Sequence, residues 1–192
     1  MQPLILASAS VYRRELLARL GLAFEALAPG VDEEQVAGES PGDRALRLAY
    51  AKAQAVARRF PGAMVIGSDQ VAVAGESVLG KPGDAAHCRA QLASLSGKTA
   101  RFYTACALLG VSASVRVAHV DTTSVVFRAL AEEEIERYVA REQPYDCAAS
   151  FKAEALGISL LECIESQDPT ALIGLPLIWL AGALRGVGYH LP

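Results

Sequence analysis

PLILASASVYRRELLARLG, residues 3–21, joins an apolar run to a segment with helical spacing, and this junction indicates the class of fold. Residues 3–7 are apolar, a pattern that predicts a buried strand. Leucines line one face of a helix over residues 11–20, and Gly21 is suited to the left-handed conformation that ends a helix. A strand followed at once by a helix is the repeating step of an α/β fold.

The same alternation continues along the chain. Strands are expected at residues 24–28, 63–66, 102–109, 115–127 and 157–163, and helices at 40–59, 85–95, 131–141 and 174–184. Ser40 and Pro41 start the first of these helices as N-cap and first helical residue. The last helix is apolar nearly all round and is expected to be buried. Because residues 110–114 resemble a hairpin turn, we predict an α/β fold with a mixed, mostly parallel, elongated sheet and flanking helices.

The composition narrows the class of protein. The chain has 192 residues, of which 52% are hydrophobic and 20% are charged, so disordered and low-complexity classes are excluded. Its net charge of −3 argues against a protein that binds long nucleic acids through their phosphates. A small anionic ligand in a local basic pocket remains compatible with this net charge.

Several features favour a cytoplasmic protein that does not enter a membrane. The first residues lack a basic leader, and the longest apolar stretch, residues 174–184, is too short to span a bilayer. The four cysteines form no C-x-x-C pair, so we expect reduced, mostly buried thiols. The sequence contains no Asn and hence no acceptor for N-glycosylation.

The first candidate for chemistry is the segment Ser8-Ala9-Ser10-Val11-Tyr12-Arg13-Arg14. It lies where a strand ends and a helix begins, so free backbone N–H groups and the helix dipole favour phosphate there. The Ser8 and Ser10 hydroxyls add donors, and Arg13 and Arg14 add guanidinium forks that fit phosphate oxygens. An ordinary serine cap followed by a solvated basic helix explains the segment equally well.

The second candidate is Asp69, in Gly67-Ser68-Asp69-Gln70, which we expect to follow an apolar strand. Ligands bind beyond the strand ends of open α/β sheets, and a carboxylate there could hold a divalent cation or activate water. For an isolated aspartate, capping a turn is the commoner role.

Two of the four lysines are further candidates. Lys81 is held between a glycine and a proline in a loop and could reach a phosphate as a point charge. Lys52, on the second helix, could reach the same ligand, although loop and helix lysines are usually solvated. Other signals fail: Gly97-Lys98-Thr99 lacks the preceding glycine of a P-loop, and the isolated histidines disfavour a zinc site.

Six motifs in order resemble the Maf family of nucleoside triphosphate pyrophosphatases over almost the whole chain. They are the S-x-S-x-x-R-R segment at residues 8–14, Val31-Asp32-Glu33, Ala51-Lys52-Ala53, Gly67-Ser68-Asp69, Gly80-Lys81-Pro82 and Gly174-Leu175-Pro176. Tyr12, Gln70 and the segment Ser150-Phe151-Lys152-Ala153-Glu154 resemble the bacterial subgroup that acts on 7-methyl-GTP.

The resemblance implies a single Maf/ITPase-like domain over residues 1–192, with two lobes around a cleft, and a homodimer. It implies hydrolysis between the α- and β-phosphates of a nucleotide, with Mg²⁺ or Mn²⁺ as cofactor. The implied catalytic residues are Asp69 (as general base), Lys52 and Lys81, and the implied phosphate-binding residues are Ser8, Ser10, Arg13 and Arg14. Glu33 and Asp69 would lie near the metal.

Base recognition is expected from Tyr12, Gln70 and Glu154. N7 methylation makes guanine cationic, which favours a stacked aromatic ring and a nearby carboxylate. Without the resemblance, Tyr12 would be a packing residue of a helix and Glu154 a solvated acid. The chain departs from the family pattern at Val11, where proline is common, and at Leu156, where a glycine or an aromatic–glycine pair is expected.

Three functions follow from these observations. The favoured one is a pyrophosphatase that removes 7-methyl-GTP, giving 7-methyl-GMP and diphosphate. A second keeps the reaction but changes the substrate to dTTP, UTP or another modified nucleotide. A third, from another class, is a non-catalytic nucleotide-binding regulator of cell division and septum formation. Release of diphosphate separates the first two from the third, and a substrate panel separates the first two.

Overall fold

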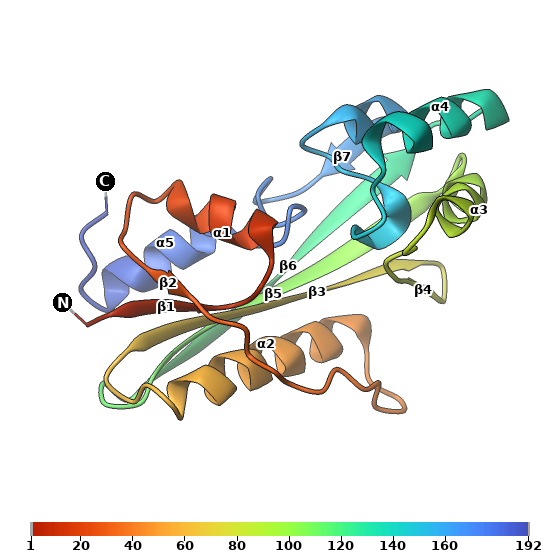
Figure 1. Cartoon of the computed structure of the whole chain (residues 1–192). Coiled ribbons are helices and arrows are strands. Elements are labelled where there is room, and N and C mark those ends of the chain that lie inside the picture. Colours follow the sequence, from red (N-terminus) through yellow and green to blue (C-terminus); the bar gives the residue numbers. More distant parts are fainter. Residues whose placement is uncertain (1, 192) are drawn as a thin grey trace. The chain divides into compact units, whose positions relative to one another are not determined.

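The computed structural model describes residues 2–191, in which strands and helices alternate as expected (Figure 1). The strands are β1 (Leu4–Ala7), β2 (Glu25–Ala26), β3 (Met64–Ala74), β4 (Ser77–Leu79), β5 (Thr99–Gly110), β6 (Val115–Phe127) and β7 (Leu161–Glu165). The α-helices are α1 (Val11–Ala18), α2 (Pro41–Ala57), α3 (Ala85–Leu95), α4 (Glu132–Glu142) and α5 (Leu177–Gly186). Two 3₁₀ segments, η1 (Ala148–Ser150) and η2 (Leu156–Leu160), precede β7.

The described strands form a seven-stranded sheet in the order β2-β1-β3-β5-β6-β7, with β4 paired to β3. β1 pairs in parallel with β2 and with β3, whereas β4 and β7 pair antiparallel with β3 and β6. The prediction of an α/β fold with a mixed sheet and flanking helices is confirmed.

The chain divides into two compact units, and β3, β5 and β6 contribute to both. Unit 1 comprises the residues up to Gln70, residues Tyr103–Asp121 and the residues from Asp168 onward. Unit 2 comprises residues Val71–Phe102 and Thr122–Gln167.

In unit 1 the side chains of β1 and β3 alternate between two apolar layers. Leu4, Leu6, Met64 and Ile66 belong to the layer that packs with α1 and α5. Ile5, Ala7 and Val65 belong to the layer that packs with α2. Figure 1 shows α2 on one face of these strands and α1 and α5 on the other. A strand covered on both faces needs apolar residues at every position, which is why residues 3–7 and 63–66 are continuous apolar runs.

The start of α2 follows from its sequence. The Ser40 hydroxyl accepts a hydrogen bond from the Asp43 amide at 3.2 Å, and Pro41 occupies the first helical position, where no amide hydrogen is needed. Seven residues of the helix are buried, and six of them are apolar. The exception is Lys52.

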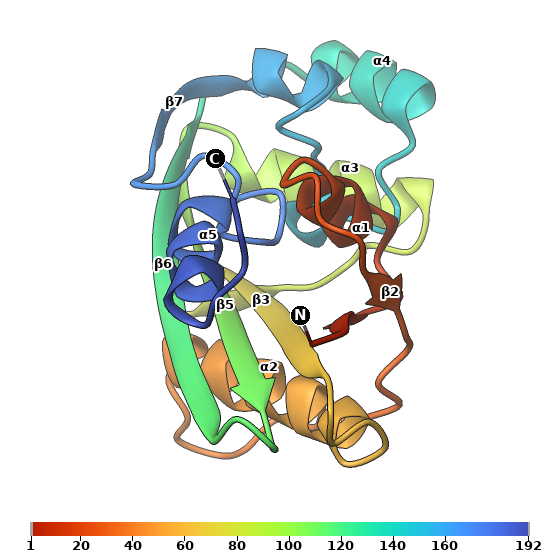
Figure 2. The ribbon, with the colours of Figure 1, turned by 90° about the vertical axis from the view of Figure 1, so that its left-hand side faces the viewer.

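Three phenylalanine rings meet in the core of unit 2. The Phe151 ring centroid lies 5.7 Å from that of Phe102 and 5.3 Å from that of Phe127, both in edge-to-face geometry. α3 packs against α4 and η1, and Figure 2 shows the two helices as neighbours.

Three local predictions were wrong. Residues 67–70 lie inside β3 rather than after it, because neighbours in unit 1 satisfy their polar groups and the ladder continues to Ala74. The last helix begins at Leu177 and not at Gly174, and Ile178 is 63% exposed rather than buried. Residues 157–160 form 3₁₀ structure before β7.

Two other expectations concern cysteines and membrane helices. All four cysteines are free: Cys88 and Cys106 are buried, whereas Cys147 is half-buried and Cys163 is exposed. Between residues 2 and 191, no helix combines the length and apolar character that crossing a bilayer requires.

Candidate active site

A buried ion pair joins α2 to the centre of β3 in unit 1. The Lys52 Nζ donates a hydrogen bond to the Asp69 Oδ1 at 2.5 Å, and the two side chains are only 8% and 9% exposed. The same Nζ lies 2.7 Å from the Oε1 of Glu33, whose side chain is half-exposed. One ammonium group therefore bridges two carboxylates, one buried and one that reaches solvent.

The strand pattern explains why Asp69 meets α2. Val65, Gly67 and Asp69 are two residues apart and share the face of β3 that α2 covers. A lysine in the buried stripe of a helix needs a compensating charge, and Asp69 supplies it. The structure thus brings Lys52, Asp69 and Glu33 together.

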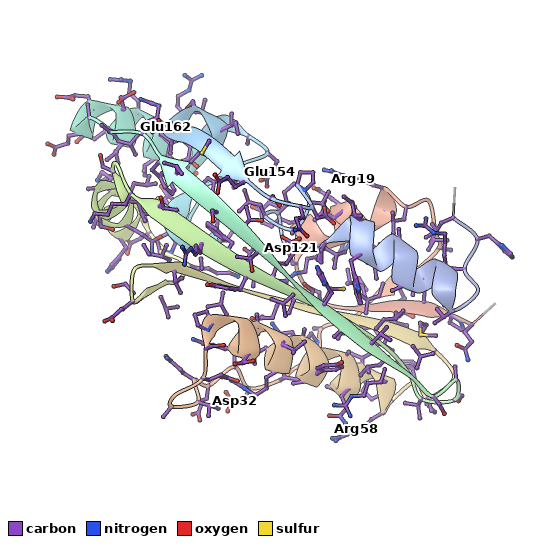
Figure 3. All side chains as sticks on the ribbon, turned by 180° about the vertical axis from the view of Figure 1, so that it is seen from behind. Arg19, Asp32, Arg58, Asp121, Glu154 and Glu162 are labelled. Carbon is purple, nitrogen blue, oxygen red and sulfur yellow. The ribbon has the colours of Figure 1, made fainter. Side chains whose placement is uncertain are left out.

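The loop that carries Glu33 is fastened to the N-terminal half of α2. Arg47 donates two hydrogen bonds to the Glu39 carboxylate, at 2.7 and 2.8 Å, and one to the Glu34 carbonyl oxygen at 3.1 Å. Arg44 donates to the Glu33 carbonyl oxygen at 3.3 Å. Figure 3 shows Asp32 beside this end of α2, with Arg58 at the other end. These contacts hold the Glu33 backbone beside Lys52.

Arg13 is fixed on the other face of β3. Its Nε donates a hydrogen bond of 2.9 Å to the carbonyl oxygen of Gly174, and the Ser68 hydroxyl donates to the same oxygen at 2.9 Å. Ser68 follows Ile66 by two residues and therefore points toward the layer of α1 and α5. Gly174 has φ +126°, a conformation that favours glycine.

The charges on the two faces influence each other. Burial lowers the pKa of Arg13, and the nearby carboxylates of Asp69 and Glu33 act in the opposite direction. Arginine stays protonated in proteins, so Arg13 contributes a full positive charge. Unit 1 thus gathers two cations, Arg13 and Lys52, and two carboxylates, Glu33 and Asp69.

The strand–helix junction after β1 is capped as the sequence predicts. Ser10 is the N-cap of α1, and its hydroxyl accepts a hydrogen bond from the Arg13 amide. The buried Ser8 hydroxyl accepts from the Ser10 amide at 3.1 Å. The helix begins at Val11, so the absence of proline there leaves its start in place. Tyr12 is half-buried and Arg14 is exposed.

Gln70 is engaged within unit 1. Its Nε2 donates to the Thr104 hydroxyl at 2.8 Å and lies 3.1 and 3.0 Å from the carbonyl oxygens of Ala171 and Leu172. These contacts bind the segment before Gly174 to β3 and β5. The Gln70 amide nitrogen is therefore used inside the protein.

The remaining predicted residues belong to unit 2. Lys81 is exposed in the loop between β4 and α3, and Glu154 is exposed between η1 and η2. The Nζ of Lys152 lies 3.6 Å from the Oε1 of Glu142 on α4. Leu156 is followed by Gly157, where a Cβ would lie 2.5 Å from the carbonyl oxygen of Lys152.

The carboxylates of Glu33 and Asp69 suit a divalent cation that would also contact the phosphates of a substrate. Magnesium is usually bound through one or two carboxylates and completed by phosphates and water. Glu33 and Asp69 already converge on one positive group, the Lys52 ammonium. Within residues 2–191, no group of three or more His, Cys, Asp or Glu residues able to hold a metal occurs.

A cavity of about 800 Å³ in unit 1 lies away from these residues. It is lined mainly by apolar side chains near the beginnings of β1 and β3, among them Leu4, Phe24 and Phe60. None of the predicted site residues lines it, so we place the candidate active site at the charged cluster.

Sequence reasoning assigned no role to Ser68, Gly174 and Arg47, although the first two lie in quoted motifs. Because successive side chains of a strand point to opposite faces of the sheet, the sequence could have placed Ser68 and Asp69 on different faces of β3. The contact of Arg13 with Gly174 spans 161 residues, and nothing in the sequence signals it.

Comparison with known families and proteins gives consistent matches. A family model described as "Maf-like protein" matches residues 3–187. A protein of Xanthomonas oryzae pv. oryzae named "7-methyl-GTP pyrophosphatase" is 56% identical over 192 residues, which cover 100% of both chains. A protein of the same name from Cupriavidus metallidurans is 51% identical over 187 residues, which cover 97% of this chain and 94% of that protein.

Among solved structures, the Ham1 protein of Staphylococcus aureus is similar to this chain with a TM-score of 0.54. The match covers 97% of this chain and 100% of that one, at 13% sequence identity. At this identity the likeness concerns the fold alone.

Proposed function

Because this chain belongs to the Maf family, we propose that it hydrolyses 7-methyl-GTP to 7-methyl-GMP and diphosphate. The full-length relatives named for this activity support the proposal. The structural observation that carries it is the Lys52 ammonium, held at the Asp69 and Glu33 carboxylates, with the Arg13 charge on the other face of β3 acting on the same carboxylates. These groups offer both positive charge for a polyphosphate and a carboxylate for water.

The phosphates would be bound by the cationic residues and the junction after β1. In this proposal Arg13 and Lys52 neutralise the triphosphate, together with Lys81 and Arg14. Ser8 and Ser10 lie where the dipole of α1 favours an anion. Because charge develops on the diphosphate as it leaves, fixed cations stabilise the transition state more than the bound substrate.

The chemical step needs a base and an aligned water. Asp69 accepts a proton from water, whose oxygen attacks the α-phosphorus. The bond from that phosphorus to the oxygen bridging to the β-phosphate then breaks, and the electron pair leaves with diphosphate. Lys52 positions Asp69 through the 2.5 Å hydrogen bond.

Glu33 and Asp69 would hold a divalent cation, Mg²⁺ or Mn²⁺. When bound, such an ion supplies further positive charge against the phosphate oxygens. Lys52 would then exchange part of its carboxylate contact for a phosphate oxygen.

Base recognition is assigned to three residues in this proposal. Tyr12 stacks on the cationic methylated base, and Glu154 accepts hydrogen bonds from the guanine N1–H and exocyclic amine. Gln70 contributes its carbonyl oxygen. The stacked ring and the carboxylate both favour a positively charged base, which distinguishes 7-methyl-GTP from dTTP and UTP.

Assembly and location are part of the same proposal. The family resemblance suggests a homodimer of one Maf-like domain per chain, and the cysteine pattern and lack of glycosylation acceptors favour the cytoplasm. Light scattering of the purified protein measures the mass of the assembly, and a mass of one chain would contradict the homodimer.

The test is diphosphate release from 7-methyl-GTP, GTP, dTTP and UTP with Mg²⁺ or Mn²⁺. We expect 7-methyl-GTP to have the highest kcat/KM. Asp69→Asn keeps an acceptor for Lys52 but removes the base, so we expect turnover to fall by about a thousandfold or more. Glu25→Gln, an exposed acid on β2, is the matched control and should leave turnover unchanged.

Two results would contradict the proposal. A higher kcat/KM for dTTP or UTP would transfer the function to those nucleotides. Nucleotide binding without any diphosphate release would support a non-catalytic regulator instead.

A further inference from the structure

Two segments of unit 2 that the proposed function uses are joined by one side chain on α3. The Gln91 Oε1 accepts a hydrogen bond of 2.5 Å from the Ser150 hydroxyl. Its Nε2 donates to the carbonyl oxygen of Gly80 at 3.3 Å. Gly80 precedes Lys81, and Ser150 begins the segment that ends at Glu154. Gln91 therefore contacts both the phosphate-binding loop and the base-recognition segment.

The Ser150 end of this link is under conformational constraint. Ala149 and Ser150 have φ values of 58° and 61°, a left-handed conformation that residues with a Cβ adopt only at a cost. Ser150 is completely buried, and its carbonyl oxygen accepts from the Cys88 thiol of α3 at 3.8 Å. The contacts with α3 hold the chain in this conformation, which sets the direction in which residues 151–154 leave the helix layer.

The Gln91 side-chain amide suits both of its hydrogen-bond partners, the Gly80 carbonyl oxygen and the Ser150 hydroxyl. The Gly80 carbonyl can only accept, so the Gln91 NH₂ group must face it and the Oε1 must face the Ser150 hydroxyl. A carboxylate could serve the serine but not the carbonyl oxygen, and an apolar side chain could serve neither. A second contact joins the same regions, since the Gly83 amide donates to the Tyr145 carbonyl oxygen at 2.9 Å.

We infer that Gln91 is a positioning residue that couples the Lys81 loop to the base-recognition segment at residues 150–154. The inference rests on the proposed function for the roles of Lys81 and Glu154. Through Gln91, the segment that recognises the base is held in register with the loop that binds phosphate. The choice of nucleotide and the rate of hydrolysis then depend on the same amide.

Variants can break the two ends separately. Gln91→Glu keeps the acceptor for Ser150 but sets a carboxylate oxygen against Gly80, so only the Lys81 end is lost. Ser150→Ala removes only the other end. Gln91→Met keeps a long unbranched side chain and removes both. Ser94→Ala is the matched control, because the exposed Ser94 hydroxyl donates to the Gln91 backbone carbonyl oxygen at 2.6 Å and its loss leaves the Gln91 side-chain amide in place.

We expect Gln91→Glu to lower kcat about tenfold on both 7-methyl-GTP and GTP, leaving the ratio of their kcat/KM values unchanged. Ser150→Ala should lower that ratio about fivefold with little change in kcat on GTP. Gln91→Met should show both effects, and Ser94→Ala neither. If Gln91 only stabilised α3, the substitutions would lower the amount of folded protein and leave the ratio of the two kcat/KM values unaltered in every variant.

Hydrogen exchange provides a readout that needs no substrate. In Gln91→Met, the amides of residues 80–83 and 150–154 should exchange faster together, while those of β5 keep their protection. If neither exchange nor the ratio changes in Gln91→Met, the coupling does not exist. If Gln91→Met fails to fold, the two single-end variants decide in the same way. If the wild-type protein releases no diphosphate, the proposed function fails, and exchange alone still decides the coupling.

Discussion

Gly67 on β3 lies against the backbone of Ala49 on α2 so closely that a Cβ at position 67 would be 2.1 Å from the Ala49 carbonyl oxygen. The same Cβ would lie 2.7 Å from the amide nitrogen of Ala53. Any side chain at position 67 would therefore push the helix off the strand. Because Lys52 is on this helix and Asp69 is two residues along the strand, the close approach sets their 2.5 Å contact.

Gly67→Ala should consequently impair both stability and activity. The clash involves backbone atoms that cannot rotate away, so we expect a loss of about 3 kcal/mol in the free energy of unfolding. Displacement of Lys52 should also lower kcat by about a hundredfold, as misplacement by an ångström can do. Urea unfolding and diphosphate release measure the two effects.

Gly62→Ala is the matched control for this substitution. An added Cβ at Gly62 meets no atom within 4 Å, and the residue lies in the exposed turn before β3. We expect its stability and kcat to match those of the wild type. A Gly67→Ala protein with wild-type kcat would show that the spacing of α2 and β3 does not position Lys52.

Ser68 should act on substrate binding through Arg13. Both residues donate to the Gly174 carbonyl oxygen, at 2.9 Å each. Ser68→Ala leaves Arg13 as the remaining donor but loosens the carbonyl that orients it. Loss of one buried hydrogen bond costs about 1 kcal/mol, so we expect KM for the nucleotide to rise about fivefold with kcat changed less.

Ser112 is the matched control for Ser68, because its hydroxyl also donates to a backbone carbonyl oxygen but lies outside the site. The Ser112 hydroxyl donates to the Pro61 carbonyl oxygen at 2.7 Å in an exposed turn. Ser112→Ala should leave KM and kcat unchanged. If Ser68→Ala lowers stability and leaves KM at the wild-type value, then Ser68 stabilises the fold and does not orient Arg13.

Much of the fold could be predicted because local signals agreed with the tertiary structure. The continuous apolar runs at residues 3–7 and 63–66 are strands covered on both faces, and Ser40-Pro41 starts α2 as expected. The strand prediction stopped at Ile66 because polar residues follow. In the structure those residues continue β3, since Lys52 satisfies Asp69 and the Gly174 carbonyl satisfies Ser68.

Local pattern could not reveal contacts between distant segments. The motifs indicated Arg13, Lys52 and Asp69, and the structure pairs Lys52 with Asp69 and places Arg13 on the other face of β3. Nothing in the sequence indicated that Gln91 would contact Gly80 and Ser150, 11 and 59 residues away. The orientation of such a side chain depends on the packing of α3, which no spacing rule encodes. The roles of Lys81 and Glu154 stay predictions from the family motifs.

The loop that carries Glu33 should lose one of its attachments to α2, the ion pair of Glu39 with Arg47, in acid. The hydrogen bond from Arg47 holds the pKa of Glu39 below the usual value for a glutamate. A carboxylate with a lowered pKa stabilises the folded state above its unfolded pKa, and this stabilisation is lost as the pH falls through the folded pKa. Glu39→Gln should therefore reduce stability at neutral pH, and this effect should shrink as the pH falls below the ordinary pKa of a glutamate.

A double-mutant cycle isolates the pair. Urea unfolding of the wild type, Glu39→Gln, Arg47→Gln and the double variant, at neutral and acidic pH, gives the interaction free energy at each pH. We expect a favourable interaction at neutral pH that declines in acid. An interaction that stays constant with pH would contradict the role of the Glu39 charge.

Glu154 should distinguish 7-methylguanine from uracil. It is exposed, so it can contact a ligand, and the proposed function gives it the guanine N1–H and amine as partners. Glu154→Gln replaces one acceptor oxygen with an NH₂ group that faces another donor, and it removes the negative charge opposite a cationic base. We expect kcat/KM for 7-methyl-GTP to fall about a hundredfold and that for UTP about threefold or less.

Glu162→Gln is the matched control. Glu162 is an exposed acid on β7 that is labelled with Glu154 in Figure 3, and its substitution should change neither value. Equal losses on the two nucleotides would show that the carboxylate does not read the base, because only a contact made with the methylated guanine can alter their ratio.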